Sequence, residues 1–170
     1  MRWLLLPEEW KDLRQQKSPT AAISFIERFW RRRDPTPLDP GNLFREAFYR
    51  RVEEADLLYG EPGLRGSLSD RGRALVLLGP PSHLQIRSKP VLRWDARKDA
   101  PRRVTTRELA LEVWGYRLED LPAGLADAAR EQKLEEALPL TLTFRSHSRR
   151  TVLEEGETLL ELAVRAAVFD

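Results

Sequence analysis

The chain has 170 residues and a formal net charge of +2, and 41% of its residues are hydrophobic while 33% are charged. This length falls within the usual range of one domain, and the apolar content excludes a wholly disordered chain. Because the sequence contains no cysteine, disulfides, thiolate nucleophiles and cysteine-ligated metal sites are excluded.

The first residues carry a short apolar run. It covers residues 3–6 and is followed by Pro7 and two glutamates, so it is too short for the core of a signal peptide or for a membrane span. The sequence therefore leaves the compartment open, and without a leader peptide we expect a cytoplasmic protein. If a leader peptide precedes this sequence in a longer precursor, we expect a protein of the cell envelope or an exported one.

Two helices are predicted before residue 35. The first covers residues 7–16, because proline suits the first helical turn and the glutamates after it favour the positive end of a helix. Ser18 and Pro19 begin the second helix, which ends before Asp34 and the prolines that follow it. One face of this helix carries apolar residues at spacings of three and four, namely Ala22, Phe25, Ile26 and Phe29.

A third helix is predicted from Asp39 to Gly60. Asp39 is a suitable cap with Pro40 at the first helical position, and Gly60 is suited to a left-handed stop. A single stripe on this helix holds Phe44, Phe48, Val52, Ala55 and Tyr59. We expect the second and third helices to pack together through their aromatic side chains.

The pattern changes after residue 60. Residues 61–70 are rich in turn formers, and the apolar run at residues 74–78 predicts a strand buried on both faces. A glycine and two prolines stop that run, and residues 83–87 are then expected to return as an edge strand. The charged segment at residues 93–107 predicts a long loop.

Alternating apolar residues predict two further strands, at residues 109–116 and 140–144. Between them, residues 126–137 are rich in helix formers, and residues 151–153 can pair back on the preceding strand through a tight turn. The tail at residues 158–168 fits both periodicities, and its alanines favour a helix.

Together these elements predict one α+β domain that spans residues 1–170. Its helical part, about residues 7–60, packs against a small, mainly antiparallel sheet in a part that covers about residues 66–155. A further helix is expected near the C-terminus.

Three segments carry a resemblance. They are residues 25–37, a helix, and residues 66–73 with the Gly-Pro-Pro turn after them; the helix carries Asn42, Phe44, Tyr49, Arg50 and Arg51. Their combination resembles the bacterial GWxTD-domain family, whose namesake motif reads Gly-Trp-x-Thr-Asp-Arg-Gly-Arg. The resemblance covers residues 3–118 and extends more loosely to about residue 155.

The namesake motif departs from the family at two positions, where Ser67 replaces tryptophan and Ser69 replaces threonine. The resemblance implies an uncharacterised domain without an established activity, whose relatives are commonly exported from bacterial cells. It also marks a set of candidate motif or interaction residues: Gly66, Ser69, Asp70, Arg71, Gly72, Arg73, Gly79, Pro80 and Pro81.

Residues that could carry catalysis are sparse. The sequence has two histidines, His83 and His147, and each falls in a predicted polar turn. Neither lies beside a Gly-x-Ser-x-Gly elbow, and neither has an acidic residue at a chelating spacing. We therefore predict no catalytic residue, no metal site and no cofactor.

The charged motif residues and the Gly-Pro-Pro turn have architectural interpretations. Ser69 or Asp70 is expected to cap the turn, while Arg71 or Arg73 pairs with an acid on a neighbouring helix. The two prolines lack the N–H groups that a phosphate loop needs, so they predict a rigid turn.

The sequence as a whole favours a non-catalytic protein interaction or structural module. Two alternatives stay open: an enzyme with a site at Asp70, Arg71 and Arg73, and a weak nucleic-acid binder that uses Trp30 and residues 31–33. We expect a protein partner in preference to nucleic acid, and the sequence leaves the identity of that partner and the oligomeric state open.

Overall fold

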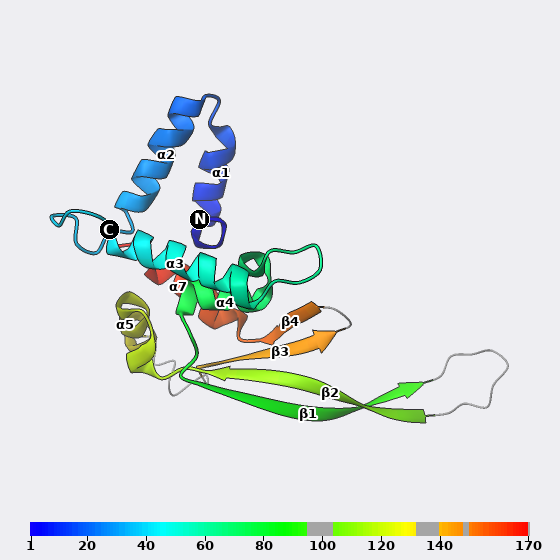
Figure 1. Ribbon diagram of the computed structural model, residues 1–170. Helices are drawn as coiled ribbons and strands as arrows, with labels where there is room; N and C mark the ends of the chain where they lie inside the picture. The colour runs from blue at the N-terminus through cyan, green and yellow to red at the C-terminus, as the bar shows by residue number, and fades with distance from the viewer. Residues whose placement is uncertain (95–103, 132–139, 148–149, 170) are drawn as a thin grey trace.

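Helices cover one face of a β-sheet in the computed structural model of the chain (Figure 1). The structure describes residues 1–94, 104–131, 140–147 and 150–169. Within these residues the sheet has the strand order β1-β2-β3-β4, and all neighbouring strands are antiparallel. The predicted α+β class is therefore confirmed.

The first α-helices begin where the sequence predicts. Pro7 and Pro19 occupy the first turns of α1 and α2, and Ser18 Oγ caps α2 by accepting a hydrogen bond from the Ala21 N–H. In Figure 1, α1 and α2 stand next to each other and point away from the sheet. The bounds in this region are a short 3-10 helix at Arg2–Leu4, α1 at Pro7–Gln15, α2 at Pro19–Arg31 and α3 at Leu43–Leu58.

Both predicted ends of the third helix are wrong. Asn42, and not Asp39 with Pro40, caps α3, because its Oδ1 accepts a hydrogen bond from a first-turn amide at 2.8 Å. Its Nδ2 also donates to the Trp30 carbonyl oxygen at 2.8 Å, a bond that a carboxylate could not make. At the other end, Gly60 does not have the left-handed backbone that was expected of it.

The packing of α2 on α3 is as predicted. The Trp30 ring lies 5.4 Å from the Phe48 ring and 5.5 Å from the Tyr49 ring, measured between centroids. Trp30 and Phe48 are both buried, so the aromatic side chains of the two helices form one part of the core.

The strand predicted at residues 74–78 is wrong, because these residues form the second half of a helix, α4 (Asp70–Leu78). Ser69 caps it, and Asp70 in the first turn favours the positive end of the helix. All five residues from 74 to 78 are buried. A helix that is buried on every side has no amphipathic stripe, so periodicity could not distinguish it from a buried strand.

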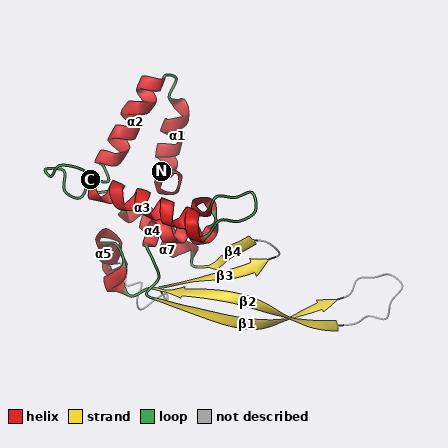
Figure 2. Cartoon of the chain, viewed as in Figure 1, coloured by secondary structure: helices red, strands yellow, loops and turns green. Residues whose placement is uncertain are grey.

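The sheet consists of two hairpins of different length (Figure 2). The edge strand predicted at residues 83–87 exists and is longer than expected, so residues 93–94 and 104–107 of the predicted loop are strand. The rest of that loop lies outside the described residues. The bounds are β1 at His83–Trp94, β2 at Val104–Gly115, β3 at Thr141–His147 and β4 at Arg150–Glu155.

The C-terminal tail is a helix, α7 (Glu157–Ala166), as its alanine content favoured. The predicted helix at residues 126–137 corresponds to α5 (Ala123–Glu131), and its last six residues lie outside the described part of the chain. Short 3-10 helices occur at Gly66–Leu68 and Leu118–Asp120. Among the described residues no helix is long and apolar enough to cross a membrane.

The core lies between the helices and strands β2 to β4. Trp114, Leu142 and Phe144 are buried on the face of the sheet that meets the helices, and the Trp114 ring lies 5.4 Å from the ring of Tyr59, the residue that follows α3. Trp114 pairs with Leu142 across the two strands. The even-numbered residues of β2 therefore face the helices.

Candidate functional site

The predicted motif at residues 66–73 forms a tight corner between α3 and α4. Ser69 Oγ donates a hydrogen bond to the Gly66 carbonyl oxygen at 2.7 Å and accepts one from the Gly72 N–H at 3.1 Å. A Cβ atom at Gly66 would lie 1.9 Å from the Ala55 oxygen, and one at Gly72 would lie 1.8 Å from the Gly66 oxygen. Both glycines are therefore required by close backbone packing.

The two arginines of the motif have carboxylate partners within the chain. Arg71 Nη1 lies 3.3 Å from Glu112 Oε2 on β2, and its guanidinium also lies over the Tyr59 ring. Arg73 donates two hydrogen bonds to Glu157 of α7, at 2.6 and 3.0 Å. These contacts support the architectural interpretation, because both charges are used to hold α4 against its neighbours.

Asp70 contacts the outer edge of the sheet at β4. Its Oδ2 accepts a hydrogen bond from the Leu153 N–H at 2.7 Å, and Glu61 Oε1 accepts one from the Thr151 N–H at 2.9 Å. The two amides are two residues apart, so they point to the same side of the strand. Carboxylates therefore occupy this edge where another strand would otherwise pair.

The Gly-Pro-Pro segment is a turn between α4 and β1. Gly79 ends α4 with a φ of +86°, a conformation that favours glycine. After Pro80 and Pro81, Ser82 Oγ donates a hydrogen bond to Asp120 Oδ2 at 2.6 Å. The segment fixes where the chain enters the sheet, in agreement with the rigid turn that the sequence predicts.

Asp56, for which the sequence predicted no role, supports the same corner. Asp56 Oδ1 accepts a hydrogen bond from the Ser67 N–H at 2.8 Å, and Asp56 also forms an ion pair with Arg65. The bonds to Ser67 and then to Arg65 lower the pKa of Asp56 to about 2. Trp3 Nε1 donates to the Ser67 carbonyl oxygen at 2.7 Å, so an indole lies here although position 67 is serine.

The basic group at residues 31–33 is partly internal. Arg33 is 0% exposed, and it donates hydrogen bonds to both carboxylate oxygens of Glu9 at 2.9 and 2.7 Å and to the Leu4 carbonyl oxygen at 2.8 Å. Trp30 is also buried. Neither side chain offers a surface on which a nucleotide base could stack.

Both histidines lie in strands of the sheet. His83 begins β1 and does not lie in the predicted turn, and its ring covers the backbone of Gly115 so closely that a Cβ there would lie 2.0 Å from Nε2. His147 is the last residue of β3. In the described parts of the chain, no group of three histidine, aspartate or glutamate residues is placed to hold a metal ion.

The strongest candidate surface lies on β1, at the opposite edge of the sheet from β4. Leu84 is 51% exposed and Ile86 is 67% exposed. They pair across the strands with Trp114 and Glu112, so their side chains point to the same face as the core. The helical layer does not cover this part of the face, and two apolar side chains remain in contact with solvent.

The backbone of β1 is also open on its outer side. Across the described residues no strand pairs with that side, and no hydrogen bond reaches it. Pro90 pairs with Glu108 in an unbroken register, so its missing N–H is expected on the outer side. Residues 84, 86 and 88 share that side and present free N–H groups, and Pro90 ends the row.

The other face of β1 is basic. Gln85, Arg87 and Lys89 are all exposed, and Arg87 Nη2 donates to Gln85 Oε1 at 2.9 Å. Because side chains alternate along a strand, the edge has one apolar and one basic side. A strand placed beside it would meet both.

Comparison with known proteins adds no assignment. No family model matches the sequence, no curated protein matches it, and no solved structure matches the fold. What the chain does is therefore inferred from its own residues and geometry.

Proposed function

We propose that the chain is a non-catalytic interaction module that binds an extended segment of a partner protein along the outer edge of β1. The single observation that carries this proposal is the row of free backbone groups beside two exposed apolar side chains, Leu84 and Ile86. Addition of a strand to an open edge supplies backbone hydrogen bonds for affinity and side-chain contacts for selectivity.

The difference between the two edges of the sheet supports the proposal. At β4, Glu61 and Asp70 bind the outer amides, and such protection prevents strand addition. At β1 the part of the chain that the structure describes provides no such partner. Only Pro90 limits the edge, and it leaves residues 83–89 available.

The side chains define the chemistry of the partner. A partner strand with apolar residues at alternate positions would contact Leu84 and Ile86 on one face. On the other face, Arg87 and Lys89 favour acidic residues. The proposed partner is therefore an extended segment in which apolar and acidic residues alternate.

A displayed library of randomised octapeptides, selected against the intact chain, tests this function. Selected peptides should alternate apolar and acidic residues and should slow amide exchange at residues 84, 86 and 88. Ile86→Lys should weaken their binding by at least roughly tenfold, while the control Leu57→Lys, at an exposed leucine of α3, should leave it unchanged. Peptides that bind Ile86→Lys as well as the original chain, or that protect other segments, would refute the proposal.

We also propose that the chain is related to the GWxTD-domain family. The namesake segment serves packing and capping through Gly66, Ser69 and Gly72. We infer that the motif defines an architectural corner, a role that depends on packing and capping and not on catalysis.

A further inference from the structure

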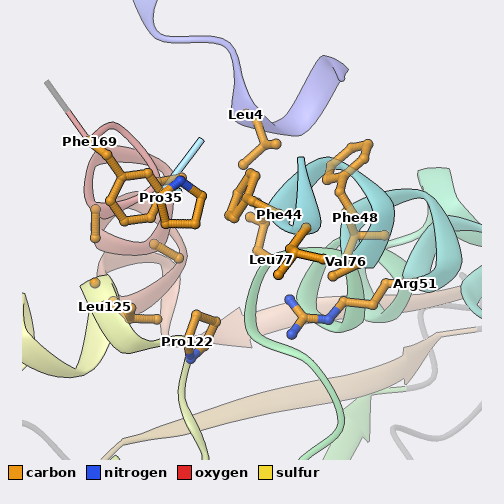
Figure 3. Close-up of a pocket in the computed structure, with 16 residues that line it drawn as sticks. Leu4, Pro35, Phe44, Phe48, Arg51, Val76, Leu77, Pro122, Leu125 and Phe169 are labelled. Carbon is orange, nitrogen blue, oxygen red and sulfur yellow. The ribbon is translucent and has the colours of Figure 1, made fainter. Parts of the chain in front are cut away.

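A cavity of about 280 Å³ lies among α3, α4, α5 and α7, away from the edge of β1 (Figure 3). Its walls include Leu4, Phe44, Leu77, Leu125 and Phe169. Except for one arginine, every lining residue is a leucine, valine, phenylalanine, proline, alanine or glycine. A concave apolar site with a single polar group is typical of a site for a small organic ligand.

The exception is Arg51 of α3. Figure 3 places its guanidinium at the cavity wall near Val76 and Pro122. Burial lowers the pKa of Arg51 from its ordinary value, and the neighbouring charge of Arg50 acts in the same direction. The environment therefore disfavours this cation unless an anion joins it.

Glu54, on the same helix, acts on the charge of Arg51 in the opposite direction to Arg50, but no anion of the described chain is bonded to Arg51. No hydrogen bond or ion pair joins it to another described residue, whereas Arg33, Arg71 and Arg73 each bind a carboxylate. A half-buried guanidinium in an apolar wall without a partner is costly for a folded protein. Its bidentate donor groups remain available to a ligand.

The turn after α4 makes room for the guanidinium. A Cβ atom at Gly79 would lie 3.3 Å from Arg51 Nη2 and 3.5 Å from its Cζ, so the planar group lies against the glycine backbone. Tyr116, which is buried, has its hydroxyl 3.5 Å from the Gly79 carbonyl oxygen. The position of Arg51 is thus held by its surroundings and is not that of a free surface side chain.

From this geometry we propose that the cavity binds a small apolar carboxylic acid, with its carboxylate on Arg51 and its hydrocarbon body among the apolar walls. The cavity volume equals that of about nine water molecules at ~30 Å³ each. An aliphatic or aromatic acid of roughly six to ten carbons is therefore the size class that fits. The inference does not depend on the proposed binding of a strand at β1.

Isothermal titration calorimetry with octanoate, and with 1-octanol as its uncharged counterpart, tests the site in the intact chain. We expect one octanoate per chain and an affinity for octanoate roughly ten- to a hundredfold higher than for 1-octanol, because a charged hydrogen bond is made only with the acid. Ala47→Leu, which fills part of the cavity, should weaken both ligands.

Two variants of neighbouring arginines distinguish specific binding of the carboxylate at Arg51 from nonspecific attraction to positive charge. Arg51→Gln should lower the octanoate affinity to that of 1-octanol, while the matched change Arg50→Gln, at an exposed arginine of the same helix that does not line the cavity, should leave octanoate binding clearly tighter than 1-octanol binding. Circular dichroism checks that each variant is folded. Absence of binding at millimolar octanoate, or equal affinities in Arg51→Gln and Arg50→Gln, overturns the proposal.

Discussion

Replacement of Arg33 by methionine should destabilise the fold strongly, because this arginine is the centre of a buried polar cluster. Its guanidinium forms two hydrogen bonds with Glu9 and one each with the Leu4 and Phe29 carbonyl oxygens, and it lies 3.8 Å from the centroid of the Phe29 ring. These contacts join the N-terminal 3-10 helix, α1 and α2. The variant would place an apolar side chain beside the buried carboxylate of Glu9, whose remaining charged partner is Arg32 Nη1 at 3.1 Å.

The expected magnitude follows from the loss of the fully buried partner of Glu9, since Arg32 is partly exposed and replaces only one of its bonds. Removal of one member of a buried ion pair costs about 3–5 kcal/mol of the free energy of unfolding. For a chain of this size the midpoint of thermal unfolding should fall by roughly 6–20 °C. Arg31→Met is the matched control, since Arg31 lies two positions before Arg33, at the end of α2, and is exposed, and its change should cost less than about 0.5 kcal/mol.

Urea denaturation, followed by tryptophan fluorescence, measures both variants. A double-mutant cycle with Glu9→Gln adds a second criterion, because removal of both charges should cost less than the sum of the single changes by roughly 1–3 kcal/mol. If Arg33→Met costs less than about 1 kcal/mol, or if the two changes are additive, the cluster does not stabilise the fold in the way described.

Three further predictions concern the corner at residues 66–73. Gly72→Ala should lower the free energy of unfolding by more than about 2 kcal/mol in urea denaturation, because its Cβ would overlap the Gly66 oxygen. The control Gly60→Ala has space for a Cβ and should change that free energy by less than about 0.5 kcal/mol. Equal costs for the two variants would contradict the packing argument. Asp56 has a pKa of about 2 against an ordinary 3.8, so its stabilising contribution is complete above about pH 4 and is lost as the pH falls toward 2. Asp56→Asn should therefore flatten the fall of the urea midpoint across that interval, and an unchanged pH profile would exclude this role. Glu157→Gln should lower the free energy of unfolding by at most about 1 kcal/mol in the same assay, because Glu157 is exposed and its ion pair with Arg73 is solvated. A loss as large as that of Arg33→Met would contradict this estimate for the ion pair.

Local signals led to correct predictions for the first two helices and for the apolar stripe of the third. Pro7, Pro19 and Ser18 mark helix starts through their own backbone and side-chain chemistry, and they act there in the structure. The stripe that contains Phe48 and Ala55 is buried as its spacing predicts. These features depend on residues within one or two turns, which a sequence records directly.

The errors have a different origin. Residues 74–78 form a helix that is buried all round, and the sequence cannot indicate which elements will surround a segment. Asn42 replaces Asp39 as the cap because Asn42 also reaches Trp30 on the preceding helix. In both cases a contact between elements outweighs the local pattern.

For the two proposed binding sites, the edge of β1 and the apolar cavity, the sequence determines which side chains are present and the fold determines how they are arranged. It supplied the arginines, the apolar residues at alternate positions of β1 and a chain without a recognisable catalytic group. The fold then paired Arg71 and Arg73 with acids from distant elements, left Arg51 beside an apolar cavity, and left Leu84 and Ile86 at an uncovered edge. Residues far away in the chain determine whether a charged side chain has a partner and whether an apolar side chain is covered. Only the tertiary structure therefore decides these two properties.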